Sequence, residues 1–191
     1  MNGSILANRS TPDRNKTDFY PTPPDVTVAL LDFLESRYLL RPRGTTIWEP
    51  ACGNGEMVRA MVGRGYNVYC SDLYPADDTV ESVDFLTTKR SPADWIITNP
   101  PFSQADQFIR HATYQLHGPC AFLLKSQFWH AQKRLDIFRQ FPPAYVLPLT
   151  WRPDFLWGAK SGSPTMEVLW TVWHGRPATT QYIPLERPGK K

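Results

Sequence analysis

Long hydrophobic runs are absent from this sequence. No stretch of the 191 residues approaches the roughly 18 apolar residues that a membrane-spanning helix needs. The segment 1–16 has no apolar centre of the kind found in secretory signals. We therefore expect a cytoplasmic protein that has no membrane partner.

Cysteine is scarce as well. The chain has three cysteines, Cys52, Cys70 and Cys120, which are widely spaced, form no CxxC pair and have no histidine at zinc-ligand spacing. Disulfide frameworks and structural zinc sites need closely patterned sets of such ligands. The sequence thus predicts reduced thiols and no metal site.

An excess of one charge is also lacking. Twenty-one Lys and Arg residues face 18 Asp and Glu residues, for a net charge of +3. This balance excludes a disordered polyelectrolyte, and it is modest for a protein that holds duplex DNA by phosphate contacts alone. The length and the 41% of hydrophobic residues are typical of one globular domain.

Proline and aromatic residues are abundant, with 19 prolines and 13% aromatic residues that include seven tryptophans. Many prolines predict short elements and constrained loops. The aromatic side chains can fill the core, or they can provide faces on which bases stack. Composition alone leaves both uses open.

Hydrophobic periodicity predicts strands that alternate with helices. Residues 1–17 are expected to form a flexible arm, 18–176 a single domain, and 177–191 a tail. Helices are predicted over 24–38, 55–64, 104–116 and 132–141, and strands over 45–49, 66–72, 95–98, 120–124, 145–149 and 167–173. Thr22 is predicted to cap the first helix. This alternation favours an α/β fold with a mostly parallel sheet, whose last two strands are antiparallel neighbours because no helix joins them.

A glycine-containing turn follows the first strand, in the segment EPACGNG. Gly53 and Gly55 allow a ligand to approach the backbone, although a plain tight turn would also use them. Asp72 lies 19 residues after Gly53 and suits a ribose diol. Val58 stands where a dinucleotide site has its third glycine, so the pattern favours a nucleoside without phosphates. Glu49 is placed to meet a cationic group.

A second polar segment, Asn99-Pro100-Pro101-Phe102, follows the strand 95–98 at the same edge of the sheet. Asn99 offers an amide oxygen, and Pro100 offers a carbonyl held by two rigid rings. Phe102 adds a flat face. This set suits a planar ring that carries an amino group, since it provides two acceptors for two N–H donors and one stacking partner. A proline-stiffened strand exit is the purely structural alternative.

Taken together, the segments YPTP, EPACGNG, SDLYP, VDF and TNPPF resemble the S-adenosylmethionine-dependent amino methyltransferases, especially the DNA N6-adenine branch. The resemblance runs from about residue 20 to 173. It implies a Rossmann-like class I methyltransferase fold, with a seven-stranded, mostly parallel sheet and an antiparallel C-terminal strand. The small size is similar to that of phage or prophage modification enzymes, which protect DNA from restriction.

The resemblance also implies roles for individual residues. Tyr20 and Thr22 would flank the methionine part of S-adenosylmethionine, and Asp84 would accept from its adenine amine. The implied cofactor-binding set is Tyr20, Thr22, Glu49, Ala51, Gly53, Gly55, Asp72, Asp84, Phe85 and Asn99. Asn99, Pro100, Pro101 and Phe102 would form the catalytic site for the target base. Lys125, at a strand end, and Arg152, in a loop similar to one in small phage-type members, are the candidate substrate contacts.

The acceptor is expected to be duplex or single-stranded DNA, with RNA as a further possibility. The loops are too short for a large target-recognition region, so the sequence predicts a short or relaxed recognition site, or specificity supplied by a second subunit. Relatives with NPP-aromatic sites also act on rRNA guanine amines or on protein glutamine.

Two other classes stay open at this point. One is a cofactor-binding subunit that is not catalytic or that depends on a partner. The other is a nicotinamide-dependent oxidoreductase, which the missing third glycine disfavours.

Overall fold

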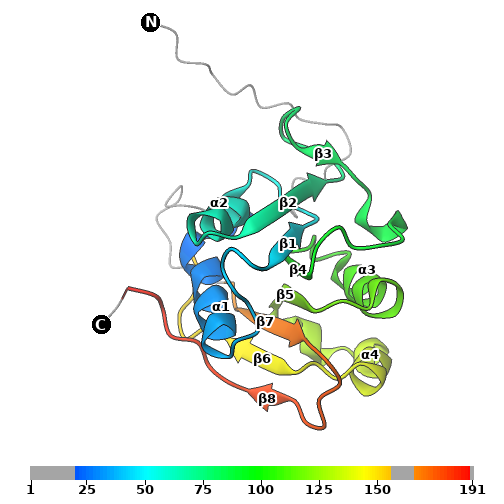
Figure 1. Cartoon of the computed structure of the whole chain (residues 1–191). Helices are drawn as coiled ribbons and strands as arrows, with labels where there is room; N and C mark the ends of the chain where they lie inside the picture. Colours follow the sequence, from blue (N-terminus) through cyan, green and yellow to red (C-terminus); the bar gives the residue numbers. More distant parts are fainter. Residues whose placement is uncertain (1–19, 156–165, 190–191) are drawn as a thin grey trace, which may run out of the picture.

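The computed structural model describes residues 20–155 and 166–189, which form one sheet with helices on both faces (Figure 1). The strand order is β3-β2-β1-β4-β5-β7-β6-β8. The strands are β1 (Thr46–Glu49), β2 (Asn67–Asp72), β3 (Glu81–Ser82), β4 (Trp95–Thr98), β5 (Cys120–Lys125), β6 (Tyr145–Pro148), β7 (Val168–Trp173) and β8 (Gln181–Tyr182). The predicted α/β fold is confirmed.

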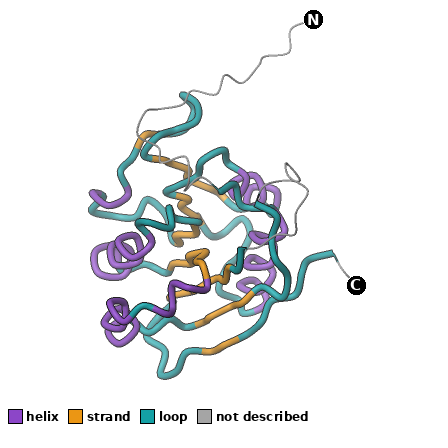
Figure 2. Tube along the Cα trace, turned by 180° about the vertical axis from the view of Figure 1, so that it is seen from behind, coloured by secondary structure: helices purple, strands orange, loops and turns teal. Residues whose placement is uncertain are grey.

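The helices lie in two layers. Helices α1 and α2 cover one face of the sheet, and α3 and α4 cover the other (Figures 1 and 2). The α-helices are α1 (Pro24–Ser36), α2 (Glu56–Gly63), α3 (Ala105–Arg110) and α4 (Leu135–Gln140). Short turns of 3₁₀-helix are η1 (Phe85–Thr87), η3 (Ser126–His130) and η4 (Gln132–Arg134), and η2 (His111–Leu116) is π-helical. No helix among the described residues is long and apolar enough to cross a membrane.

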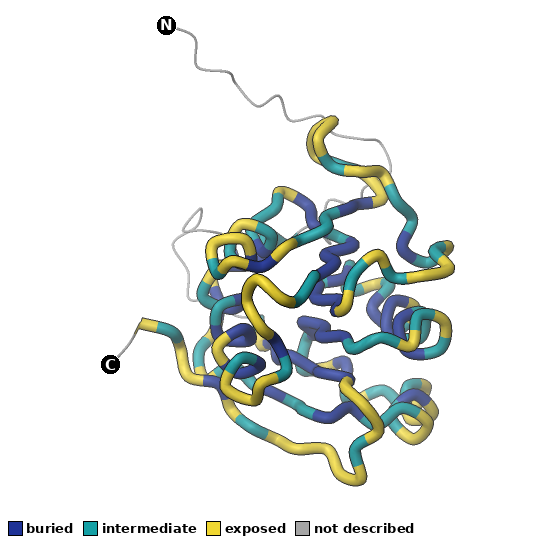
Figure 3. The backbone as a smooth tube through the Cα atoms, viewed as in Figure 1, coloured by how far each residue is buried: buried dark blue, intermediate teal, exposed yellow. Residues whose placement is uncertain are grey.

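The central strands are apolar on both sides because helices cover both faces. In β1, Ile47 packs in the core under α1 and α2, while its neighbour Trp48 packs in the core beside α3. In β4, Ile97 and Ile96 divide between the two cores in the same way. Buried residues accordingly concentrate along the middle of the sheet, and the exposed ones lie around it (Figure 3).

The strand directions place several carboxyl ends at one edge of the sheet. Strands β2, β1, β4 and β5 are parallel neighbours, with Thr98 of β4 opposite Phe122 of β5. Strand β7 runs antiparallel to both β5 and β6. This confirms the prediction that the strands near 145–149 and 167–173 are antiparallel neighbours.

The sheet has eight strands, where the periodicity predicts six and the family resemblance implies seven. The two-residue strands β3 and β8 lie at its two edges and have only exposed residues, so they give no hydrophobic pattern. Strand β8 belongs to the segment 177–191 that was expected to be a tail. It pairs with β6, and Leu185 nearby is buried in the core with 6% exposure. The segment thus covers what would otherwise be an open sheet edge.

Two predicted helices end differently in the structure. The first ends at Ser36 rather than at 38, because Tyr38 adopts a left-handed conformation (φ 57°) and the N–H of Leu39 bonds to the carbonyl of Leu34. The helix predicted over 104–116 is α-helical only to Arg110 and continues as the π-helical turn.

Candidate active site

A cavity of about 220 Å³ lies at the carboxyl ends of β1, β2 and β4. Glu49, Asp72 and Asn99, which end or follow these strands, all line it. Open α/β sheets bind ligands at this edge. The structure thereby brings together the two polar segments that the sequence analysis singled out.

The glycine turn forms one wall of the cavity. Gly53 and Gly55 both have positive φ values, 55° and 80°, which favour glycine. The two carboxylate oxygens of Asp72 accept hydrogen bonds from the backbone N–H groups of Gly53 and Tyr74, each at 2.9 Å. Asp72 therefore fixes the turn against the end of β2. A carboxylate has further acceptor positions, so this role is compatible with a ribose contact.

Glu49 is a carboxyl group of the cavity whose pKa is strongly shifted by burial. Its side chain is fully buried, and its Oε1 accepts from Thr98 Oγ1 at 2.5 Å and from the N–H of Ala51 at 3.2 Å. Its Oε2 is buried without a hydrogen-bond partner. Burial raises the pKa of Glu49 to about 8 despite these two hydrogen bonds, which favour the charged form. An added positive charge would stabilise the ionised carboxylate.

The cavity is acidic. Among the described residues that line it, Glu49, Glu56, Asp72 and Asp84 carry carboxyl groups, and none carries a Lys, Arg or His side chain. Such a lining fits the ammonium and sulfonium charges of S-adenosylmethionine. It does not fit the pyrophosphate of a nicotinamide dinucleotide, which needs donors and positive charge.

Asp84 and Phe85 also line the cavity. Asp84 accepts from the backbone N–H of Leu86 at 2.9 Å and so caps the short turn η1. The ring of Phe85 is 2% exposed, stacks on Phe108 at 4.6 Å between ring centroids, and meets Trp48 edge-on at 5.2 Å. These contacts hold a flat, apolar wall beside a carboxylate, which suits an adenine ring with its amino group.

Asn99 is held by the segment that precedes α1. Its Nδ2 donates to the carbonyl of Tyr20 at 3.2 Å and to Thr22 Oγ1 at 3.0 Å. Its Oδ1 is buried and has no hydrogen-bond partner. The prediction that Thr22 caps α1 is wrong: Pro23 occupies that position without a side-chain bond, and the Thr22 hydroxyl serves Asn99 instead. The carboxamide is thus fixed, and its Oδ1 is a buried acceptor that lacks a donor.

The remaining residues of the Asn-Pro-Pro-Phe segment lie around Asn99. Pro100 is buried, and Pro101 lines the cavity. Phe102 is half-buried, with its ring 5.4 Å from that of Tyr20, and it does not line the cavity. The Lys125 ammonium lies 4.1 Å from the Phe102 ring centroid and 5.4 Å from that of Tyr20. A cation and two aromatic rings therefore gather beside Asn99.

Arg152 lies further out. Its guanidinium pairs with Glu167 at 2.9 Å, and both side chains are more than half exposed. An exposed pair of this kind adds little stability. The structure therefore leaves Arg152 outside the cavity, which Phe102 and Lys125 do not line either.

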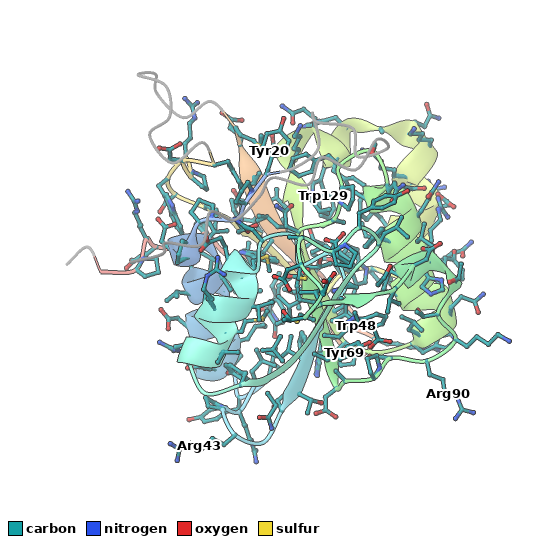
Figure 4. All side chains as sticks on the ribbon, turned by 90° about the horizontal axis from the view of Figure 1, so that it is seen from above. Tyr20, Arg43, Trp48, Tyr69, Arg90 and Trp129 are labelled. Carbon is teal, nitrogen blue, oxygen red and sulfur yellow. The ribbon has the colours of Figure 1, made fainter. Side chains whose placement is uncertain are left out.

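Sequence reasoning missed several contributors, among them Glu56, which lines the cavity, and Thr98 and Phe155, which support residues that line it. Thr98 is a buried polar residue at the end of an apolar strand, a signal that could have revealed its bond to Glu49. Phe155 packs edge-on against Tyr20 at 6.2 Å, a contact across 135 residues that no local pattern indicates. In Figure 4, Tyr20 and Trp129 lie on one side of the view, whereas Arg43 and Arg90 project outward on the opposite side.

Comparisons with known proteins identify the fold. No family model matches the sequence, and no curated protein matches it. A candidate class I S-adenosylmethionine-dependent methyltransferase from Listeria monocytogenes superposes with a TM-score of 0.61 at 12% identity, over 86% of this chain and 65% of that one. A candidate RNA methyltransferase from Pyrococcus horikoshii gives 0.61 at 15% identity, over 88% and 94%.

The type IIG restriction endonuclease BpuSI gives a TM-score of 0.63 at 13% identity, over 91% of this chain and 27% of that one. The chain thus spans about two thirds of the Listeria protein and about a quarter of the endonuclease. At such low identities the likeness concerns architecture. This protein has the Rossmann-like class I methyltransferase fold.

Proposed function

We propose that the protein transfers a methyl group from S-adenosylmethionine to the exocyclic N6 amine of adenine in DNA, at a short or relaxed recognition site. The observation that carries the proposal is the orientation of Asn99. Its amide nitrogen is engaged by Tyr20 and Thr22, and its Oδ1 is left as a buried acceptor beside an acidic cavity. An unpaired buried acceptor is unfavourable by about 1–3 kcal/mol, and a ligand N–H would relieve this.

Different cavity residues would contact different parts of the cofactor. Glu49 would face its positive charge, Asp72 its ribose hydroxyls, and Asp84 with Phe85 its adenine. Tyr20, Thr22, Ala51 and Gly53 would provide the surrounding wall, and Gly55, which does not line the cavity, would keep the turn in its conformation. When bound, S-adenosylmethionine supplies an electrophilic methyl group that an amine can take up in one displacement, the sulfur keeping the bonding electrons and the amine losing a proton.

The target amine would be oriented by acceptors rather than activated by a strong base. Its lone pair is delocalised into the ring, so hydrogen bonds from its N–H groups to Asn99 Oδ1 and to the Pro100 carbonyl would favour a pyramidal nitrogen. Phe102 would offer a stacking face, worth about 1–3 kcal/mol per base in single-strand binders. Correct positioning can contribute up to roughly 7–11 kcal/mol to such a reaction.

DNA is favoured as the acceptor for two reasons. The YPTP and TNPPF segments resemble the DNA N6-adenine branch, and a restriction endonuclease is among the structural neighbours. A base inside a duplex must first be flipped out, at a few kcal/mol, so single-stranded DNA is expected to be the easier substrate.

Methyl transfer from labelled S-adenosylmethionine tests the proposal. Duplex DNA, single-stranded DNA, RNA and glutamine-containing peptides are offered separately, and the products are digested and identified by mass spectrometry. We expect N6-methyladenine in DNA. Label in RNA or in glutamine alone would overturn the assignment of the acceptor.

Asn99→Ala removes the acceptor atom and tests its role in methyl transfer. We expect at least a hundredfold loss of methyl transfer with cofactor affinity retained within a few-fold, because orientation of the amine is lost while the carboxylates remain. Asn67→Ala, at an exposed asparagine of β2, is the control and should retain full activity. Near-full activity of Asn99→Ala would remove the basis of the proposal.

A further inference from the structure

A basic subsite lies next to Asn99, outside the acidic cavity. Its centre is Lys125, the last residue of β5, whose half-buried side chain does not line the cavity. Thr98 pairs with Phe122, so the segment after β4 runs beside the end of β5. Asn99 therefore shares a cavity with the carboxylates, and the cation lies near it through Tyr20, whose carbonyl accepts from Asn99 Nδ2.

The Lys125 ammonium is held without neutralisation. It rests over the rings of Phe102 and Tyr20, at 4.1 and 5.4 Å from their centroids. Among the described residues it forms no ion pair, and the carboxylate of Glu167, beside the end of β5, is already paired with Arg152. Cation–π contacts fix the position of a charge but leave the charge itself unneutralised. An anion that binds next to Phe102 would therefore meet a positive charge whose position is already fixed.

We infer that Lys125 binds a backbone phosphate of the target nucleotide, which makes the acceptor a nucleic-acid strand rather than a free base or a protein glutamine. The inference rests on the proposed function for the position of the target ring on Phe102. A glutamine side chain or a nucleobase carries no anion for this site, whereas every nucleotide in a strand carries one beside its sugar.

Binding of a fluorescein-labelled single-stranded oligonucleotide with one adenine tests the inference without requiring methyl transfer. Affinity is measured by fluorescence anisotropy over a series of salt concentrations. Each phosphate contact on a single strand contributes about 0.7 to the slope of log affinity against log salt. For Lys125→Met, which keeps the length of the side chain without its charge, we expect the slope to be shallower by about 0.7. Lys125→Arg keeps the positive charge and should retain the wild-type slope.

Arg90→Met is the charge-matched control, because Arg90 is exposed and lies on the opposite side from Tyr20 (Figure 4). It should leave the slope unchanged. A second oligonucleotide, with a neutral methylphosphonate on each side of the adenine, should bind the wild-type protein more weakly. The affinity of Lys125→Met should be the same for the modified and for the unmodified oligonucleotide.

An unchanged slope in Lys125→Met, or equal sensitivity of both proteins to the neutral linkages, would overturn the inference. So would a wild-type protein that binds no oligonucleotide. A Lys125-dependent slope without any methyl transfer would leave the phosphate contact standing and would count against the proposed function alone.

Discussion

Glu49 gives the protein a stability that depends on pH in an unusual direction. Its pKa rises from 4.5 to about 8 on folding, because burial penalises the charged carboxylate. Between these two values the folded state holds a proton that the unfolded state has released. Stability due to this group is therefore fully present below pH 4.5 and is lost as the pH rises towards 8.

The size of the effect follows from the shift. One pKa unit corresponds to about 1.36 kcal/mol, and integration between pH 5.5 and 7.5 gives a loss of roughly 2–3 kcal/mol from Glu49. Glu49→Gln keeps the shape and cannot ionise, so it should escape this loss. Relative to the wild type, the variant should gain roughly 2–3 kcal/mol over this range, or about 4–12 °C in melting temperature for a chain of this size.

Thermal unfolding of both proteins at pH 5.5 and 7.5, without cofactor, measures this change. The comparison between proteins cancels every other titrating group that they share. Glu186→Gln, at an exposed carboxylate, is the control and should track the wild type at both pH values. If the difference between Glu49→Gln and the wild type were the same at both pH values, Glu49 would not be protonated in the folded protein, and the reasoning from burial would fail.

Two further predictions concern the cavity and the sheet edge. At pH 7, binding of S-adenosylmethionine should release up to about one proton from the wild type and none from Glu49→Gln, because a cation favours the carboxylate over the acid. Calorimetry in buffers of different ionisation enthalpy measures the number of protons released. Asp72 and Cys52 are the ionisable groups next to Glu49, and both proteins contain them. Equal proton release from both proteins would contradict the prediction. Leu185→Ala should destabilise the protein by about 2–5 kcal/mol in denaturant unfolding, since it empties a buried position. A loss below about 0.5 kcal/mol would show that 177–191 is dispensable for the sheet.

The sequence is sufficient to predict the elements that carry strong local signals. The strand ending at Glu49, the glycine turn and the Asn-Pro-Pro-Phe exit follow from apolar runs bounded by glycine or proline, and parallel strands necessarily bring their carboxyl ends to one edge. The antiparallel neighbours β6 and β7 follow from the absence of a helix between them.

The contacts that complete the site are not local and could not be predicted in this way. Asn99 and Tyr20 are 79 residues apart in the sequence. The local sequence around Thr22 predicts a helix cap, and only the tertiary contact with Asn99 shows that its hydroxyl has another partner. The position of Lys125 over Phe102 likewise depends on the register of β4 and β5. Strand β8 has no apolar alternation, because both of its residues are exposed at the sheet edge.

The bonds from Asn99 to Tyr20 and Thr22 have a consequence for how this protein can vary. Tyr20 and Thr22 form part of the cavity wall and also set the angle of the Asn99 carboxamide. A substitution in 20–22 that reshapes the wall therefore also tilts the acceptor atom. These positions are pleiotropic: evolution or engineering cannot retune the cavity through them without altering the geometry offered to the second substrate.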